Sequence, residues 1–371
     1  MTGPCTTFVF KREQDVDFQA DVYLPSEDQL KRAGHQKAPV LVYFHGGGLC
    51  TGNRDWNDLV PTWLFFEAVE KGIAIVSLPF CAAKGASSRL PIDLQISLDY
   101  TLLGPQTAHD AIQDAKDGLR FIHEDLNHKL EQHSSIRIDS ARIAVCGSSA
   151  GGTLAYYSGI YSPFPLKAVI GLYAGAGDLL TDWYLQEKKE PFVPGVPLLT
   201  DDKPFISILH APRDTTPPTV RTDHDGDHGP RSKLLFYLLQ TGSLVDTLSG
   251  TRGASEVLRR LPSKFERERL VCDYKDVKKV IPSLCVTEKF PPTYLVHGDA
   301  DTLVHLEESR NMYHTLRKKG VEVHLWEMEG GGHGCDTDGG WASSPGSKDD
   351  ELSRKREHGL KKVLPWLLKH L

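Results

Sequence analysis

Five short apolar runs that recur along the chain constrain its fold more than any other feature. They begin at Ala38, Ile73, Ala141, Lys167 and Pro292, and three of them end in glycine. Each run is apolar at nearly every position, as expected of a strand that is buried on both faces. Helical patterns separate the runs; residues 108–122, for example, repeat apolar side chains at spacings of three and four. This alternation predicts an α/β fold around a doubly wound, mostly parallel sheet.

Segments outside these runs complete the expected architecture. Residues 6–12 and 17–24 alternate apolar and polar side chains around a polar link, which predicts two strands that face each other. Residues 323–329 predict a further strand, and 309–319 and 351–371 have helical patterns. We therefore expect helices to cover the sheet.

The stretch from about Asp178 to about Phe290 breaks this rhythm because it contains no convincing parallel strand. An insertion of this size is too long for a plain connection, and it predicts a largely helical cap over an active site. An unrelated interaction module is the weaker alternative. The expected division is a core of residues 1–177, a cap of residues 178–290 and a second part of the core, residues 291–371.

The pentapeptide G-S-S-A-G, residues 147–151, follows an apolar strand and precedes a helical stretch. This is the context of a G-x-S-x-G nucleophile elbow, in which a sharp turn strains the central serine and requires small neighbours. The turn also places Ser149 at a helix N-terminus, where developing negative charge is favoured. We expect Ser149 to be a nucleophile. An ordinary glycine-rich turn is the alternative, and Ser148 occupies the wrong position of the motif.

A second motif, H-G-G-G, begins at His45 and ends the first buried strand. Acyl transfer through a tetrahedral oxyanion requires preorganised N–H donors, and glycines let the backbone approach the substrate oxygen. The expected donors are the amides of Gly47 and Gly48, joined by the amide of Ala150. We interpret His45 itself as a structural residue.

The acid and the base of a triad are expected near the C-terminus. Asp301 comes just past the run at Pro292, at the edge of the sheet where such folds carry their sites, and His333 lies in a glycine loop after the next strand. The order Ser, Asp, His is the order that this architecture uses, and the carboxylate would orient the imidazole. Asp299 is the main alternative to Asp301, and Asp178 is a lesser one.

Together these motifs resemble the hormone-sensitive-lipase-like branch of the α/β hydrolases, also called the α/β hydrolase fold-3 carboxylesterases. The resemblance extends from about Val40 to the C-terminus, except for the insertion, and rests on H-G-G-G, G-S-S-A-G-G, H-G-D-A-D-T-L-V and G-G-H-G. It implies hydrolysis of a carboxylic ester of a small molecule, without a cofactor. The chain departs from the family at Ser148, where an aspartate is common, and at residues 78–86, which replace a Y-R-L-A-P-E segment.

Other functions of the same fold stay open at this point. Acyl transfer, thioester release and carbon–carbon bond chemistry on a small metabolite would use the same triad. A ligand-binding receptor is possible because fold does not determine function, although a receptor has no need of His333.

Bulk properties restrict the class of protein. Of the 371 residues, 40% are hydrophobic and 25% are charged, as in globular rather than disordered proteins. The net charge of −6 offers no basic excess for nucleic acid. Residues 1–10 lack a secretory pattern, and the apolar runs are too short to span a membrane. The seven cysteines suit reduced thiols, so we expect a cytoplasmic protein without a membrane partner.

A metal site is not expected. The stretch D-H-D-G-D-H at residues 223–228 could chelate a divalent ion, but it lacks fixed ligand spacing. It also lies within residues 212–233, whose Pro, Asp, His and Gly content predicts an exposed loop.

Overall fold

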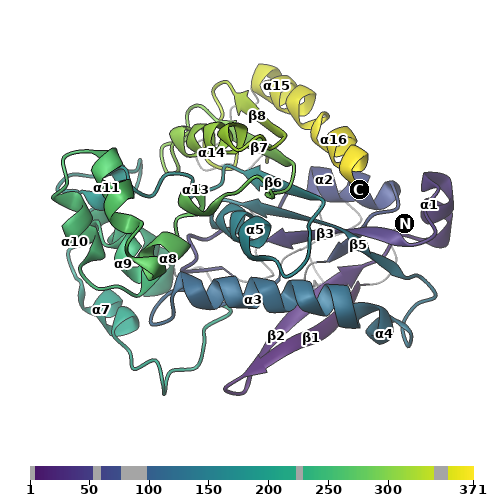
Figure 1. The fold of residues 1–371 in the computed structure, drawn as a ribbon, viewed down its shortest axis with the longest axis horizontal. Helices are drawn as coiled ribbons and strands as arrows, with labels where there is room; N and C mark the ends of the chain where they lie inside the picture. Colours follow the sequence, from purple (N-terminus) through teal and green to yellow (C-terminus); the bar gives the residue numbers. More distant parts are fainter. Residues whose placement is uncertain (1–4, 53–59, 77–97, 223–228, 338–349) are drawn as a thin grey trace.

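A central sheet organises the computed structural model, which describes residues 5–52, 60–76, 98–222, 229–337 and 350–371 (Figure 1). Eight strands within these ranges pair in the order β1-β2-β4-β3-β5-β6-β7-β8. The first two strands are antiparallel to their neighbours, and every pair from β4 to β8 is parallel. The strands are β1 (Cys5–Glu13), β2 (Val16–Tyr23), β3 (Ala38–Phe44), β4 (Ala74–Val76), β5 (Ile138–Ser148), β6 (Ala168–Leu172), β7 (Thr293–Gly298) and β8 (Val323–Met328). The predicted mostly parallel sheet is confirmed.

Helices cover both faces of the sheet. One face packs against α3 (Ala108–Arg120), α5 (Ala150–Tyr161) and α14 (Glu307–Lys318), and the other against α2 (Thr62–Glu70), α15 (Asp350–Leu360) and α16 (Val363–His370). Along β3, Val40 and Val42 belong to the first core, whereas Leu41 and Tyr43 belong to the second. Because both faces are buried, this strand is apolar at consecutive positions rather than alternate ones.

Shorter helices lie at the edges of these layers. They are α1 (Glu27–Ala33), the π-helical turn η1 (Phe121–Asp125) and α4 (Leu126–Leu130). Helix α1 begins with a capping box between Ser26 and Gln29 and ends at Gly34 in the left-handed conformation. None of the helices in the described ranges is long and apolar enough to cross a membrane.

The described part of residues 178–290 adds helices and no strand to the sheet. Figure 1 shows α7 to α11 gathered beyond one end of the sheet, on the left of the view. The helices are α6 (Asp182–Leu185), α7 (Lys203–Leu209), α8 (Pro230–Thr241), α9 (Leu244–Ser249), α10 (Ala254–Arg259), α11 (Lys264–Val271), α12 (Lys275–Lys279) and α13 (Pro282–Cys285).

The expectation of an exposed loop over residues 212–233 agrees with the exposed residues 212–215, but it is wrong for residues 218–221, which pack against the core, and from Pro230 on, where a helix begins. Val220 is 6% exposed, and the guanidinium of Arg221 lies 3.0 Å from the buried carboxylate of Asp99. Helix α8 begins within the expected loop, at Pro230. Turn-forming composition reports local preference, whereas these contacts are made with a distant part of the core. Residues 223–228 lie outside the described residues.

A buried glutamate joins the beginning of the 178–290 segment to the core. Glu308, on α14, is 3% exposed, and its Oε2 accepts a hydrogen bond of 2.8 Å from the backbone N–H of Asp178. A Cβ at Gly177 would lie 2.1 Å from the backbone oxygen of Glu308, so the two segments pack in direct backbone contact. Burial raises the pKa of Glu308 to about 8, and the amide of Asp178 opposes this rise.

The raised pKa of Glu308 predicts that the free energy of unfolding depends on pH, and that Glu308→Gln removes this dependence. An unfolded chain releases this proton near the ordinary value of 4.5, whereas the folded chain keeps it up to about 8. The protonated Glu308 therefore contributes its full stabilisation to the free energy of unfolding below pH 4.5, and this stabilisation is lost as the pH rises towards 8. Denaturant unfolding across this range should show a decline of a few kcal/mol that E308Q lacks. Glu307→Gln, at a neighbouring exposed position, is the control, and equal slopes in E308Q and the unaltered protein would contradict this prediction.

Candidate functional site

Ser149 stands on a strained turn between β5 and α5. Its backbone has φ 53° and ψ −121°, a conformation that L-residues rarely adopt. The turn tolerates no side chains beside it: a Cβ at Gly147 would lie 2.0 Å from the oxygen of Gly151, and a Cβ at Gly151 would lie 2.0 Å from the oxygen of Phe44. The backbone therefore has the geometry that the pentapeptide predicts.

The structure brings Ser149, His333 and Asp301 together. Nε2 of His333 lies 2.9 Å from Oγ of Ser149, and Nδ1 of the same ring lies 2.7 Å from Oδ2 of Asp301. All three side chains are buried. They come from turns that follow β5, β7 and β8, which are parallel strands of one sheet and therefore present them at the same edge.

The surroundings of Asp301 keep its carboxylate ionised. Oδ1 accepts hydrogen bonds of 2.9 Å from the backbone amides of Leu303 and Val304. Burial by itself would raise the pKa of Asp301, but His333 and the nearby His297 outweigh burial and hold this pKa well below its ordinary value. A buried anion here can orient the imidazole and stabilise its protonated form.

The alternative acids do not reach His333. Asp299 is exposed, and its Oδ1 accepts a hydrogen bond of 2.7 Å from the amide of Gly330. Asp178 pairs instead with Nζ of Lys264 at 2.5 Å. The geometry therefore favours Asp301.

Two further residues of the motifs have structural partners. The hydroxyl of Ser148 lies 2.5 Å from the hydroxyl of Tyr43 in the buried interior. The ring of His45 stacks on Tyr100 with 4.4 Å between the ring centroids, and burial lowers the pKa of His45 to about 4. Both observations agree with the interpretation that neither residue is the nucleophile or the base.

The glycine motif after β3 forms a loop of left-handed residues. Gly47, Gly48 and Leu49 have φ angles of 101°, 65° and 59°, and the oxygen of Gly47 accepts from the amide of Cys50 at 3.0 Å. Among the described residues, the amides of Gly47, Gly48 and Ala150 have no protein acceptor. Ala150 is the first residue of α5, where helical N–H groups have no intrahelical partner. These amides can bind an anionic oxygen.

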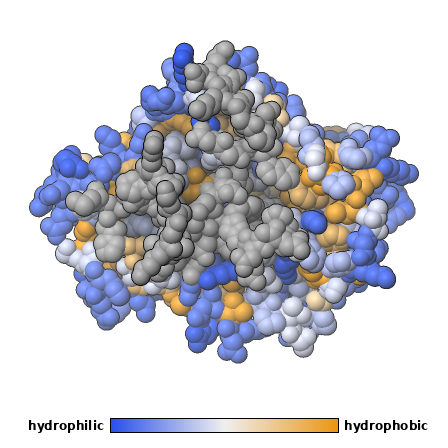
Figure 2. Space-filling model, turned by 180° about the vertical axis from the view of Figure 1, so that it is seen from behind, coloured by the Kyte–Doolittle hydropathy of each residue, from blue (hydrophilic) through white to orange (hydrophobic). Residues whose placement is uncertain are grey.

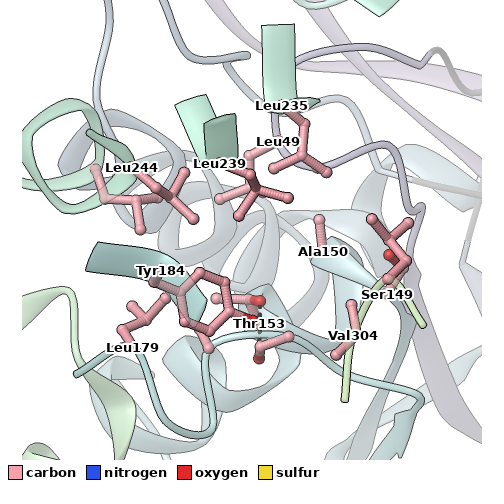
Figure 3. A pocket seen from close by; sticks show the side chains of 15 residues that line it. Leu49, Ser149, Ala150, Thr153, Leu179, Tyr184, Leu235, Leu239, Leu244 and Val304 are labelled. Carbon is pink, nitrogen blue, oxygen red and sulfur yellow. Dashed lines mark hydrogen bonds between the residues drawn. The ribbon is translucent and has the colours of Figure 1, made fainter. Parts of the chain in front are cut away.

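An apolar cavity of ≈ 60 Å³ opens beside Ser149. Figure 3 shows Ser149 at one end and Leu244 at the other, with Leu239 and Tyr184 between them. Its walls come from the glycine loops, the turn after Asp301, and helices α5, α6, α8 and α9: Gly48, Leu49, Ser149, Ala150, Thr153, Gly175, Ala176, Leu179, Tyr184, Leu235, Leu239, Leu244, Leu248, Leu303 and Val304. The sequence analysis did not predict the leucines of α8 and α9, because no motif marks a pocket wall. The apolar composition of residues 234–241 is the one signal in the sequence that could have pointed to α8.

The described residues contain no group of three His, Cys, Asp or Glu side chains that could hold a metal ion. The stretch 223–228, the one possible chelator in the sequence analysis, lies outside them. The described cysteines are free thiols. Burial raises the pKa of Cys50 to about 12, so this thiol, although next to the glycine loop, is a poor nucleophile.

Some large apolar side chains of the 178–290 segment are exposed on the surface. Figure 2 shows the molecule from behind, so the 178–290 helices, at the left of Figure 1, are at the right of Figure 2. The visible apolar side chains gather mainly on that side. The exposed large apolar residues of that segment include Ile206, Val257, Phe265 and Tyr274.

Comparison with a protein-family profile gives a partial match. Residues 264–368 match the prolyl oligopeptidase family, and this segment contains both Asp301 and His333 but not Ser149. The match covers less than half of the chain.

Similar full-length proteins include one esterase and several synthases. The chain is 26% identical over 313 residues to probable carboxylesterase M8 of Phoma sp. (strain ATCC 20986 / MF5453), covering 84% of this chain and 82% of that protein. It is also 26% identical over 353 residues to non-reducing polyketide synthase ascC of Acremonium egyptiacum, covering 92% of this chain. The chain spans only 14% of that synthase.

Solved structures define the fold. A thermophilic esterase of Thermogutta terrifontis superimposes with a TM-score of 0.51 and 18% identity, covering 97% of this chain and 91% of the esterase. An acetyl ester-xyloside bifunctional hydrolase of Caldicellulosiruptor lactoaceticus gives a TM-score of 0.50 at 17% identity, with 96% of each chain covered. The chain has the α/β-hydrolase fold, as the sequence predicts.

The two candidate acids can be separated by substitution. Asp301→Asn removes the charge that orients His333, so it should slow the reaction of Ser149 with a fluorophosphonate by about 10³–10⁴-fold. Asp299→Asn, two residues away and exposed, should change that rate by less than about 3-fold. Labelling rates measured by mass spectrometry, with unfolding temperatures as a check on folding, decide the matter. The reverse ranking would show that Asp299 is the acid.

Proposed function

We propose that this protein is a serine hydrolase that cleaves a carboxylic ester of a small molecule through an acyl-enzyme on Ser149. The observation that carries the proposal is the continuous hydrogen-bonded series from Ser149 through His333 to Asp301, with distances of 2.9 Å and 2.7 Å. The similarity to a probable carboxylesterase over 84% of the chain supports the same reaction class.

The geometry suits a two-step acyl transfer to water. Asp301 holds the Nδ1–H of His333, so Nε2 is free to accept the proton of Ser149 as Oγ attacks the ester carbonyl. The amides of Gly47, Gly48 and Ala150 would bind the oxyanion of the tetrahedral intermediate. His333 would then return the proton to the leaving alcohol and activate a water molecule that hydrolyses the acyl-enzyme.

Residues 178–290 would act as a cap that selects the substrate. Helices α8 and α9 supply Leu235, Leu239, Leu244 and Leu248 to the cavity wall, and none of the described residues that line it is charged. An apolar cavity of ≈ 60 Å³ next to the nucleophile suits a short acyl chain better than a polar or bulky one.

Thioester release is the second candidate, and the matches to polyketide synthases favour it. The same nucleophile, base and oxyanion amides would attack a thioester carbonyl, and a thiolate would leave in place of an alkoxide. Since the chain spans only 12–14% of these synthases, their overall activities are not transferred to it. The hormone-sensitive-lipase-like branch and a cytoplasmic location stay predictions from the sequence.

Labelling and turnover together test the proposed function. A fluorophosphonate should modify a single peptide, the one that holds Ser149, and Ser149→Ala should abolish labelling while Ser148→Ala keeps it. Turnover of a small ester in oxygen-18 water should mark the released acid. An unlabelled acid formed at full rate, or an adduct on Ser148, would overturn the proposal. A higher kcat/KM for the N-acetylcysteamine thioester than for the matching alkyl ester would favour thioester release.

Leu244 should limit the length of the acyl chain, because it lies at the far end of the cavity from Ser149 (Figure 3). In Leu244→Ala the ratio of kcat/KM for hexanoyl to acetyl esters should rise by about 10-fold, because the smaller side chain makes room for about two more methylenes, each of which gains roughly 0.8 kcal/mol of burial. Leu234→Ala is the matched control: Leu234 is equally apolar and fully buried on α8, but it does not line the cavity. A parallel rise in L234A would mean that loosened packing, not pocket depth, sets chain length.

A further inference from the structure

A second buried carboxyl lies close to the proposed base and has no role in the mechanism above. Asp336 follows His333 by three residues on the loop after β8, and it is 3% exposed. Its Oδ2 accepts a hydrogen bond of 2.9 Å from Nε1 of Trp63, on α2. The carboxyl thus connects the loop that carries His333 to a helix on the opposite face of the sheet from α5.

Tyr173 links this carboxyl to the ring of His333. The two rings meet edge to face, with centroids 5.0 Å apart and planes at 70°. Tyr173 is fully buried; burial raises the pKa of its hydroxyl, and the charge of Asp336 raises it further. The fully buried side chain of Tyr173 therefore lies near the carboxyl of Asp336 and in ring contact with His333.

The loop that carries His333 is rich in glycine, so its own sequence does not fix the position of the imidazole. Four glycines surround His333 in G-G-G-H-G, residues 330–334, and glycine loses more conformational freedom on folding than any other residue. His333 must nevertheless hold hydrogen bonds to both Ser149 and Asp301. Beyond the glycines, the loop is fastened by Asp336 and by a hydrogen bond of 2.8 Å from Arg356 to the oxygen of Thr337.

The same interior contains Ser148, where the resembling family commonly has aspartate. Its hydroxyl contacts Tyr43 at 2.5 Å, and the charge of Asp336 contributes to the raised pKa of Tyr43, after burial. Asp336 and Ser148 are therefore both close to Tyr43 in the same buried region.

We propose that Asp336 is a positioning residue for His333. Its carboxyl would hold the loop that carries His333 against Trp63, and would thereby keep the imidazole ring in contact with Tyr173. The proposal rests on the proposed function, since it gives His333 the part of the base. A displacement of the imidazole by about 1 Å is enough to cost about 100-fold in rate without a change in substrate affinity. The effect should therefore fall on kcat rather than on KM.

Four variants test the proposal in the full chain. Asp336→Ala removes the acceptor, Asp336→Asn keeps an oxygen that can accept from Trp63, and Trp63→Phe removes the donor but keeps a ring. Trp366→Phe is the matched control, because Trp366 lies in the same core and its Nε1 also donates to a carboxylate, Glu322, at 3.3 Å.

Three measurements are made on each variant: kcat and KM for an ester, the rate of fluorophosphonate labelling, and the low-field proton resonance of the His333 Nδ1–H. We expect D336A and W63F to lower kcat and the labelling rate by at least about 10-fold with KM within about 2-fold, and to shift or broaden the resonance. D336N should stay within about 3-fold of the unaltered protein, and W366F should change only the unfolding temperature.

Unchanged kcat, labelling and resonance in W63F would overturn the proposal, as would an equal loss of activity in W366F. If D336A does not fold, W63F and D336N decide the outcome. If the unaltered protein hydrolyses no ester, the proposed function fails on its own, and the resonance still reports whether Asp336 and Trp63 hold His333 on Asp301.

Discussion

The backbone conformation of Ser149 is the constraint on which the arrangement of the site depends. A backbone φ of 53° is retained only where the surroundings leave no alternative. Here the elbow itself is in backbone contact with the chain at the end of β3 and at the end of β6. Gly151 packs against the oxygens of both Phe44 and His45, at the end of β3. Since the H-G-G-G loop continues directly from β3, the contact that permits the elbow also sets the separation between Ser149 and the amides proposed to bind the oxyanion.

The electrostatic environment of Asp301 is the second constraint on the site. Burying a carboxylate is costly unless hydrogen bonds and opposite charge compensate, and Asp301 has two backbone amides and two imidazoles around it. Asp299, only two residues away, is exposed and accepts from a loop amide instead. The difference between the two residues lies in their environment and not in their side-chain chemistry.

The 178–290 segment, whose helices α7 to α11 gather beyond one end of the sheet (Figure 1), is joined to the core by several contacts. A Cβ at Gly48 would lie 2.6 Å from Leu235, so α8 rests directly on the oxyanion loop. Arg231 donates to the oxygens of Leu103 and Gly104, and Glu308 binds the first residue of the segment from beneath. The segment proposed to select the substrate and the loop proposed to bind the oxyanion thus share one packed interface, so changes in the segment should reach that loop through Leu235.

Local patterns in the sequence were sufficient to predict the sheet and to single out Ser149, Asp301 and His333. Continuous apolar runs identify strands buried on both faces, and parallel strands necessarily bring their C-terminal ends to one edge, where Ser149, Asp301 and His333 follow them. The elbow is equally local, because its strain and its glycines lie within five residues.

Other features were decided only by the tertiary structure. Trp63 and Asp336 are 273 positions apart, and no periodicity or motif relates them. The leucines of the cavity and the contact of Arg221 with the buried Asp99 depend in the same way on how separate segments pack, while composition alone indicated an exposed loop at residues 212–233. A sequence pattern records what each segment prefers by itself; which distant partners then satisfy its buried polar groups is determined by the packing of the whole chain.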